Sequence, residues 1–146
     1  MGNPHTLTVP GRYDQIQPIC NFVAQAAEEA GFDDDAVFHV QLACDEACTN
    51  VIEHSYGAEN VGDITVSCQV QSNDFTIMIR DHGRPFDPDD IPHPRVPTSS
   101  NELDQLKVGG LGIHFMRKLM DEVRFMFDQQ GNTLVMIKRL PGGKRQ

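Results

Sequence analysis

Hydrophobic residues recur along this chain with two different periods. In residues 13–30 they return every three or four positions, which predicts an amphipathic helix. A second amphipathic helix is predicted after Asp33-Asp34-Asp35, which supply a cap and first-turn acids, and it runs to about His54 or Ser55. Another helix is predicted just after the glycines at 109–112. Strand-like runs occupy the remaining hydrophobic segments, which are residues 5–9, 63–71, 75–81, 123–127 and 133–140. This order predicts an α+β two-layer sandwich, with helices on one face of a mixed, mostly antiparallel sheet.

Length and charge narrow the class of protein further. The 146 residues fit a single domain over 1–146, and 12 lysines and arginines stand against 21 acidic residues, for a formal charge of -9. This balance argues against nucleic acid or an anionic membrane as a partner, because neutralising phosphates needs clustered cations. No apolar run approaches the ~20 residues of a membrane span. The start of the chain has no charged-then-apolar signal pattern, so we expect a cytoplasmic protein.

Four cysteines leave two interpretations open. Cys20, Cys44, Cys48 and Cys68 include no C-x-x-C pair. Cys44 and Cys48 lie four residues apart with His54 nearby in sequence, so zinc has to be considered. Free thiols that act as small core residues on one helix face are the favoured interpretation.

The segment from about 86 to 108 differs from the rest of the chain. Five of the nine prolines fall between residues 84 and 98, and a run of small polar residues follows. Stretches of this length without regular structure are uncommon inside compact domains, and they usually form lids or binding loops. We expect a lid here.

Two polar residues share one face of the second predicted helix. Glu46 and Asn50 are one turn apart and lie away from the core stripe around Val40 and Cys44, so both side chains can reach one ligand. A carboxylate can accept a proton, and an amide oxygen can coordinate Mg²⁺. Solvated polar side chains are the alternative explanation.

Two further motifs fit a nucleotide. Asp81 ends a predicted strand and is followed by Gly83, so its carboxylate can accept a hydrogen bond from an exocyclic amine such as that of adenine. Residues 109–112, Gly-Gly-Leu-Gly, directly precede a helix, where free amides and the helix dipole favour phosphate. An ordinary turn aspartate and a hinge are the respective alternatives. The spacing matches neither a P-loop nor a dinucleotide fingerprint.

Taken in order, these motifs resemble the GHKL ATPase superfamily, whose fold is the Bergerat ATP-binding fold. More narrowly, residues 45–56, 81–88, 109–113, 120–123 and 131–138 resemble the anti-sigma factor serine kinases, and the resemblance covers roughly residues 5–140. Pro85 stands where the broad superfamily often has a second glycine, and many anti-sigma kinases also lack that glycine.

The resemblance implies a role for each motif residue. Glu46 would be the general base for a substrate serine, and Asn50 would hold Mg²⁺. Asp81 would bind the adenine amine, Gly83 would make room for the ring, and Thr133 would support the adenine pocket.

The resemblance also implies a phosphate site. The residues that would present amides to the phosphates are Gly110, Leu111, Gly112 and Ile113. Lys107 is the candidate for the basic residue that meets the γ-phosphate. His54 would lie near the phosphates or act as a structural histidine.

The implied function is that of an ATP- and Mg²⁺-dependent serine protein kinase and anti-sigma factor. It would bind a sigma factor and phosphorylate a serine of a small anti-anti-sigma protein of the STAS type, as a homodimer that exchanges the two partners. The alternative is a non-catalytic module of the same fold, in which ATP only shapes a protein-binding surface, and Glu46 favours the enzyme. A histidine-kinase catalytic domain is disfavoured, because no helix pair with a phosphoacceptor histidine precedes the motifs.

Overall fold

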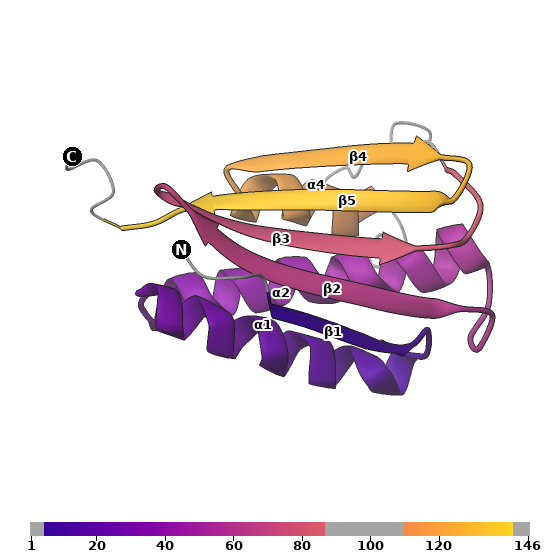
Figure 1. Cartoon of the computed structure of the whole chain (residues 1–146), viewed down its shortest axis with the longest axis horizontal. Coiled ribbons are helices and arrows are strands. Elements are labelled where there is room, and N and C mark those ends of the chain that lie inside the picture. Colours follow the sequence, from indigo (N-terminus) through magenta and orange to yellow (C-terminus); the bar gives the residue numbers. More distant parts are fainter. Residues whose placement is uncertain (1–4, 87–109, 142–146) are drawn as a thin grey trace, which may run out of the picture.

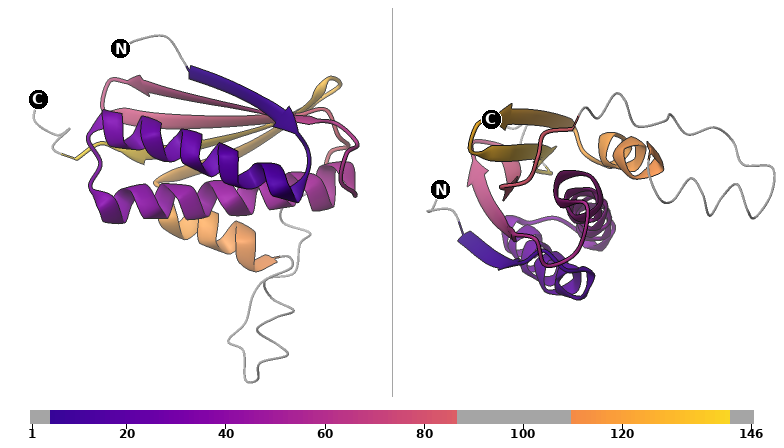
Figure 2. Two further views of the ribbon diagram at one scale, coloured as in Figure 1. Left: turned by 90° about the horizontal axis from the view of Figure 1, so that it is seen from below. Right: turned by 90° about the vertical axis from the view of Figure 1, so that its right-hand side faces the viewer.

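The computed structural model describes residues 5–86 and 110–141, as one sheet with helices on one face (Figures 1 and 2). The strands are β1 (His5–Pro10), β2 (Asp63–Gln71), β3 (Asp74–Asp81), β4 (Glu122–Asp128) and β5 (Gly131–Arg139). The helices are η1 (Tyr13–Gln15, 3-10), α1 (Ile16–Ala30), α2 (Asp34–Asn50), η2 (Val51–Tyr56, a π-helix) and α4 (Gly110–Leu119). The strand order is β1-β2-β3-β5-β4. Every strand pair within the described residues is antiparallel, so the predicted two-layer α+β sandwich is confirmed without a parallel pair.

The helices α1, α2 and α4 form the core with the inner face of the sheet. Asp33 caps α2 by accepting a hydrogen bond from the amide of Ala36 at 2.9 Å, and Asp34 and Asp35 follow in the first turn, where negative charge is favourable. The buried positions of α2 are Val37, Val40, Ala43, Cys44, Ala47, Cys48 and Asn50. Asn50 is thus a polar residue on an otherwise apolar buried stripe. Within residues 5–86 and 110–141, no helix is long and apolar enough to cross a membrane.

The cysteines are core residues with free thiols. All four are buried, with Cys20 on α1, Cys44 and Cys48 on α2, and Cys68 on β2. Burial raises the pKa of Cys68 to about 12, so this thiol stays neutral. No group of three or more histidine, cysteine or acidic side chains in the described ranges can hold a metal ion. The prediction that these cysteines are small core residues is confirmed by their burial.

The candidate motifs meet at one end of the sandwich. The carboxyl ends of α2 and β3 and the amino ends of α4 and β5 point toward the same end, on the right of Figure 1. The second predicted helix continues beyond α2 as the π-helix η2 and ends at Gly57, which has φ +81°. π-Helices are rare and often occur at functional sites. Except for Phe86, the predicted lid at 86–108 lies outside the described residues, as does Lys107.

Gly131 allows β5 to begin directly against Asp81. Its φ is +142°, and a Cβ at this position would overlap the carbonyl oxygen of Asp81. Gly31 also has a positive φ, +108°, but a Cβ there would meet no atom within 4 Å. Gly31→Ala therefore adds only backbone strain, while Gly131→Ala adds a steric clash as well.

We expect Gly131→Ala to lower the free energy of unfolding by about 3 kcal/mol or more, because strain and overlap act together. Gly31→Ala should lower it by about 1 kcal/mol. Urea denaturation of both variants measures the difference. Equal losses would show that the contact between Gly131 and Asp81 does not constrain the fold.

Candidate functional site

Asp81 places a buried carboxylate at the end of β3. Asp81 is 2% exposed. Its Oδ1 accepts hydrogen bonds from the amide of Gly83 at 2.8 Å and from Nδ2 of Asn132 at 2.9 Å. Burial raises the pKa of Asp81, and the hydrogen bonds from Gly83, Asn132 and Ser55 oppose that rise. The bonds from Gly83 and Asn132 both end on Oδ1.

Asn132 connects the three elements that surround this carboxylate. Besides Asp81, its Nδ2 lies 3.1 Å from Oγ of Ser55 in η2 and 2.9 Å from the carbonyl oxygen of Arg84. Sequence reasoning did not identify Asn132. The pairing register explains its position, since Asp81 lies opposite Asn132 on the inner face of the sheet. Side chains alternate between the two faces of the sheet from Gly131 onward. This alternation assigns Asn132 to the inner face only when the strand register is known.

Thr133 lies on the opposite face of the same strand pair. It stands opposite Arg80, and its hydroxyl accepts a hydrogen bond from Nη1 of Arg80 at 2.7 Å. Thr133 still lines the small cavity beside Asp81. Its support of an adenine pocket stays a prediction, and its hydroxyl is directed to Arg80.

A small cavity lies against Asp81 and is lined in part by aromatic rings. Its lining residues are Val51, Ile79, Asp81, Phe86, Phe125, Phe127, Asn132, Thr133 and Leu134. Its volume is about 10 Å³, the space of a single water molecule. The ring of Phe86 lies 6.0 Å from that of Phe125 and 5.8 Å from that of Phe127, both edge to face. Phe86 therefore limits the space in front of the carboxylate.

Three buried polar atoms have no hydrogen-bond partner within the described part of the chain. They are Nδ2 of Asn50, Nε2 of His54 and Oδ1 of Asn132. Asn50 is 5% exposed, and the His54 ring lies 5.6 Å from that of Phe86. Buried polar atoms in proteins almost always have partners, so these atoms indicate a place for a ligand or water. Glu46 is half-buried one turn before Asn50.

At Gly83 the segment after β3 packs closely against the π-helix η2. A Cβ at Gly83 would lie 2.5 Å from the carbonyl oxygen of Ser55. Beside it, the amide of Arg84 donates to the same oxygen at 3.0 Å, and Nε of Arg84 donates to the carbonyl oxygen of His54 at 3.2 Å. These bonds satisfy carbonyl groups at the end of a helix. Close contact with Ser55 thus requires glycine at 83, and its role beside a ring stays a prediction.

The predicted phosphate residues form the first turn of α4. Residues 110–113 begin this helix, which packs against α2. The first amides of a helix have no partner within it, so they can face an anion. Ile113 is 4% exposed and belongs to the core, so only its backbone can serve a ligand.

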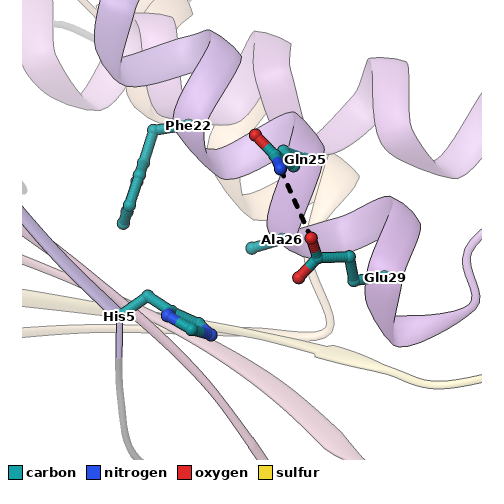
Figure 3. Close-up of a pocket in the computed structure, with 5 residues that line it drawn as sticks. All are labelled: His5, Phe22, Gln25, Ala26 and Glu29. Atoms are coloured by element: carbon teal, nitrogen blue, oxygen red, sulfur yellow. Dashed lines mark hydrogen bonds between the residues drawn. The ribbon is translucent and has the colours of Figure 1, made fainter.

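A second hollow lies between β1 and α1, away from these residues. It is lined by His5, Phe22, Gln25, Ala26 and Glu29, as Figure 3 shows. Glu29 accepts a hydrogen bond from Gln25 at 3.4 Å. β1 and β3 are separated by β2, so this hollow is distinct from the cavity at Asp81.

Comparisons with known proteins agree with this arrangement. A family model described as the histidine kinase-like ATPase domain matches residues 9–138. The serine-protein kinase RsbW of Bacillus velezensis is 32% identical over 137 residues, which cover 93% of this chain and 85% of the relative. The serine-protein kinase RsbW of Bacillus licheniformis is 37% identical over 132 residues, which cover 90% of this chain and 82% of the relative.

Solved structures share the fold. The crystal structure of the RsbU and RsbW domains of Rv1364c from Mycobacterium tuberculosis superposes with a TM-score of 0.66 at 18% identity, and covers 95% of this chain and 33% of that one. The histidine kinase domain of a blue-light activated histidine kinase from Erythrobacter litoralis superposes with a TM-score of 0.55 at 15% identity, over 93% of this chain and 64% of that one. The Bergerat-type sandwich predicted from the sequence is confirmed.

We expect Asn132→Ala to raise the pKa of Asp81 further, because it removes a hydrogen bond that stabilises the ionised carboxylate. Thr133→Val is the matched control and should leave the pKa unchanged, since its hydroxyl contacts Arg80. Carbon-13 NMR titration of the aspartate carboxyl groups measures both values. A larger shift in the Thr133→Val protein would refute the assignment of Asn132 as the partner of Asp81.

Proposed function

The chain belongs to the histidine kinase-like ATPase domain family, together with the RsbW serine-protein kinases, and we propose that it transfers the γ-phosphoryl group of ATP to a serine of a protein substrate. The observation that carries the proposal is the buried Asp81 carboxylate. Gly83 and Asn132 hold one of its oxygens, and the residue lines a cavity. Such an acceptor matches an amine of a nucleotide base.

The base would bind where Asp81, Asn132 and Phe86 meet. Oδ2 of Asp81 would accept a hydrogen bond from the exocyclic amine of adenine. A purine ring needs far more space than the cavity of about 10 Å³, so the Phe86 ring has to move aside when the base enters. The same ring, with Phe125 and Phe127, would then offer an apolar wall to the base.

The phosphates would lie between α2 and the first turn of α4. The free amides of residues 110–113 supply neutral donors, and Lys107 remains the proposed cation for the γ-phosphate. The residue proposed to hold Mg²⁺ is Asn50, because an amide oxygen is the kind of ligand this ion takes. Bound Mg²⁺ would neutralise charge on the phosphates.

Glu46 would act as the general base. The serine oxygen attacks the γ-phosphorus, the bond to the bridging oxygen breaks, and ADP leaves with that oxygen. The serine proton passes to the carboxylate of Glu46, one turn from Asn50 on the same helix. Phosphoryl transfer depends mainly on the positioning of the reactants and on neutralisation of the phosphate charge, and a positioned base is the remaining requirement.

The proposal includes the partners that the sequence resemblance implies. A sigma factor and an anti-anti-sigma protein of the STAS type would bind in turn. The anti-anti-sigma protein would be the substrate that receives the phosphoryl group. A sigma factor as partner would place the protein in the cytoplasm. The homodimer is supported by the resemblance alone, and analytical ultracentrifugation of the purified chain tests it.

We expect Asp81→Asn to weaken ATP binding at least about tenfold, because the new amide can place a donor against the adenine amine, a buried mismatch of about 1–3 kcal/mol. Asp74→Asn is the matched control at the other end of β3 and should leave affinity unchanged. Calorimetric titration with ATP and Mg²⁺ measures both. Unchanged affinity in the Asp81→Asn protein would remove Asp81 from the site.

We expect Glu46→Gln to slow phosphorylation of the anti-anti-sigma protein by about a hundredfold or more, since a positioned base contributes about 10²–10⁴ in rate. ATP and sigma-factor binding should stay near normal, because Asp81, Asn50 and the first turn of α4 are unchanged. Glu53→Gln is the control, as Glu53 contacts Tyr13 instead.

The experiment uses labelled ATP, Mg²⁺ and anti-anti-sigma proteins from the same genome. A parental rate in the Glu46→Gln protein would exclude Glu46 as the base. If the unmodified protein binds ATP but transfers no phosphate to any of these proteins, the non-catalytic binding module is the better description.

A further inference from the structure

Charge is strongly segregated along this chain. Residues 13–79 contain 12 of the 21 acidic residues and none of the 12 lysines and arginines. This segment forms α1, α2, η2, β2 and most of β3, all within the described residues. Of the α-helices that the structure describes, α1 and α2 therefore carry acidic side chains without a lysine or arginine among them.

A large aromatic ring stands exposed within this acidic layer. Phe38 on α2 is 60% exposed, the highest value among the large hydrophobic residues that the structure describes. Helical spacing places it on one stripe with four other residues. We call this stripe the α2 ridge, and its members are Asp34, Asp35, Phe38, Leu42 and Asp45. The three aspartates are exposed and Leu42 is half-buried, so the ridge is an apolar strip between carboxylates.

The α2 ridge borders Glu46, the proposed general base of the kinase. Glu46 follows Leu42 by one helical turn and follows Asp45 directly in sequence. A protein that lies along the ridge would therefore pass beside Glu46. An exposed aromatic residue with an apolar neighbour is also the kind of anchor that dominates the energetics of protein interfaces.

We propose that the α2 ridge docks the protein substrate of the kinase. The substrate would place an apolar side chain on Phe38 and Leu42, and lysine or arginine residues against Asp34, Asp35 and Asp45, with its acceptor serine beside Glu46. This proposal rests on the kinase function proposed above and adds where the substrate binds and which chemistry its surface carries.

Charge complementarity favours a basic protein as the partner of the α2 ridge over a second copy of this chain or a nucleic acid. In a twofold dimer the same patch faces itself, which would bring the three aspartates of each copy against those of the other. Like charges across an interface oppose association. A nucleic acid is repelled for the same reason. A basic protein surface is the complementary partner.

The test measures KM for the protein substrate and for ATP, together with kcat, using anti-anti-sigma proteins from the same genome. The variants are Phe38→Ala and the double variant Asp34→Asn, Asp35→Asn. Glu122→Gln is the control, because Glu122 is an exposed acid on β4, outside the helical layer, and pairs with Arg124. Circular dichroism and urea denaturation establish that each variant folds.

We expect each ridge variant to raise KM for the protein substrate about tenfold, as loss of an interface anchor does, with kcat and KM for ATP unchanged. The control should stay within about twofold of the parent. Added salt should raise KM for the protein substrate more in the parent than in the double variant, because the variant has lost the charges that salt screens.

The outcomes separate this proposal from the kinase function. If the parent phosphorylates its substrate and both ridge variants keep the parental KM, the docking surface is wrong and the kinase function stands. If the parent phosphorylates none of these proteins, both proposals are wrong. If Phe38→Ala turns a dimer into a monomer while KM stays unchanged, the ridge is an interface between two copies, and the docking proposal is overturned.

Discussion

A buried carboxylate is the constraint around which one end of this protein is built. Removing an ionised carboxyl group from water costs several kcal/mol unless donors replace the lost water. At Asp81 the donors are the amide of Gly83 and the side chain of Asn132. Each has to come from a different segment, one that follows β3 and one that begins β5. The ends of these strands are therefore held together by the need to solvate one group.

The same requirement explains several local features that otherwise look unrelated. Gly131 has no side chain because β5 starts against the Asp81 carbonyl, and Gly83 has none because it lies on the carbonyl of Ser55. The π-helix brings Ser55 to Nδ2 of Asn132, and Arg84 binds the carbonyl groups at the end of that helix. Helix end, strand end and strand start form one connected hydrogen-bonded unit. The cavity at Asp81 is part of this unit, so its shape depends on all three segments.

The sequence alone was sufficient for features that depend on local periodicity. Alternation and helical spacing located the five strands and the helices, and the acidic cap at Asp33 fixed the start of α2. The strand-end place of Asp81 also followed from spacing. Spacing placed Asn50 away from the core stripe, and the structure corrects this, because Asn50 is 5% exposed and belongs to the buried positions of α2. Features that depend on two segments at once could not be found in this way.

The neighbouring residues Asn132 and Thr133 show why such features are hidden. Adjacent residues of a strand point to opposite faces, so a shift of one position exchanges their roles. Only the pairing of β3 with β5 shows that Asn132 reaches Asp81 and that Thr133 reaches Arg80. The place of Phe86 at the cavity likewise depends on its contacts with two rings of β4 and a histidine of η2, which no single segment reveals.

The raised pKa of Asp81 connects the stability of the empty site with ligand binding. Because its pKa in the folded protein lies above the unfolded value, the native state holds its proton more tightly. Stability therefore falls as pH rises from the unfolded pKa through the raised one, and the deficit persists at neutral pH. A ligand amine that donates to Oδ2 favours the ionised form, lowers the pKa and removes part of that deficit. Binding should accordingly strengthen as pH rises through the same window. The Asp81 carboxylate thus destabilises the protein when the site is empty, and the same carboxylate makes the site select a ligand that donates a hydrogen bond.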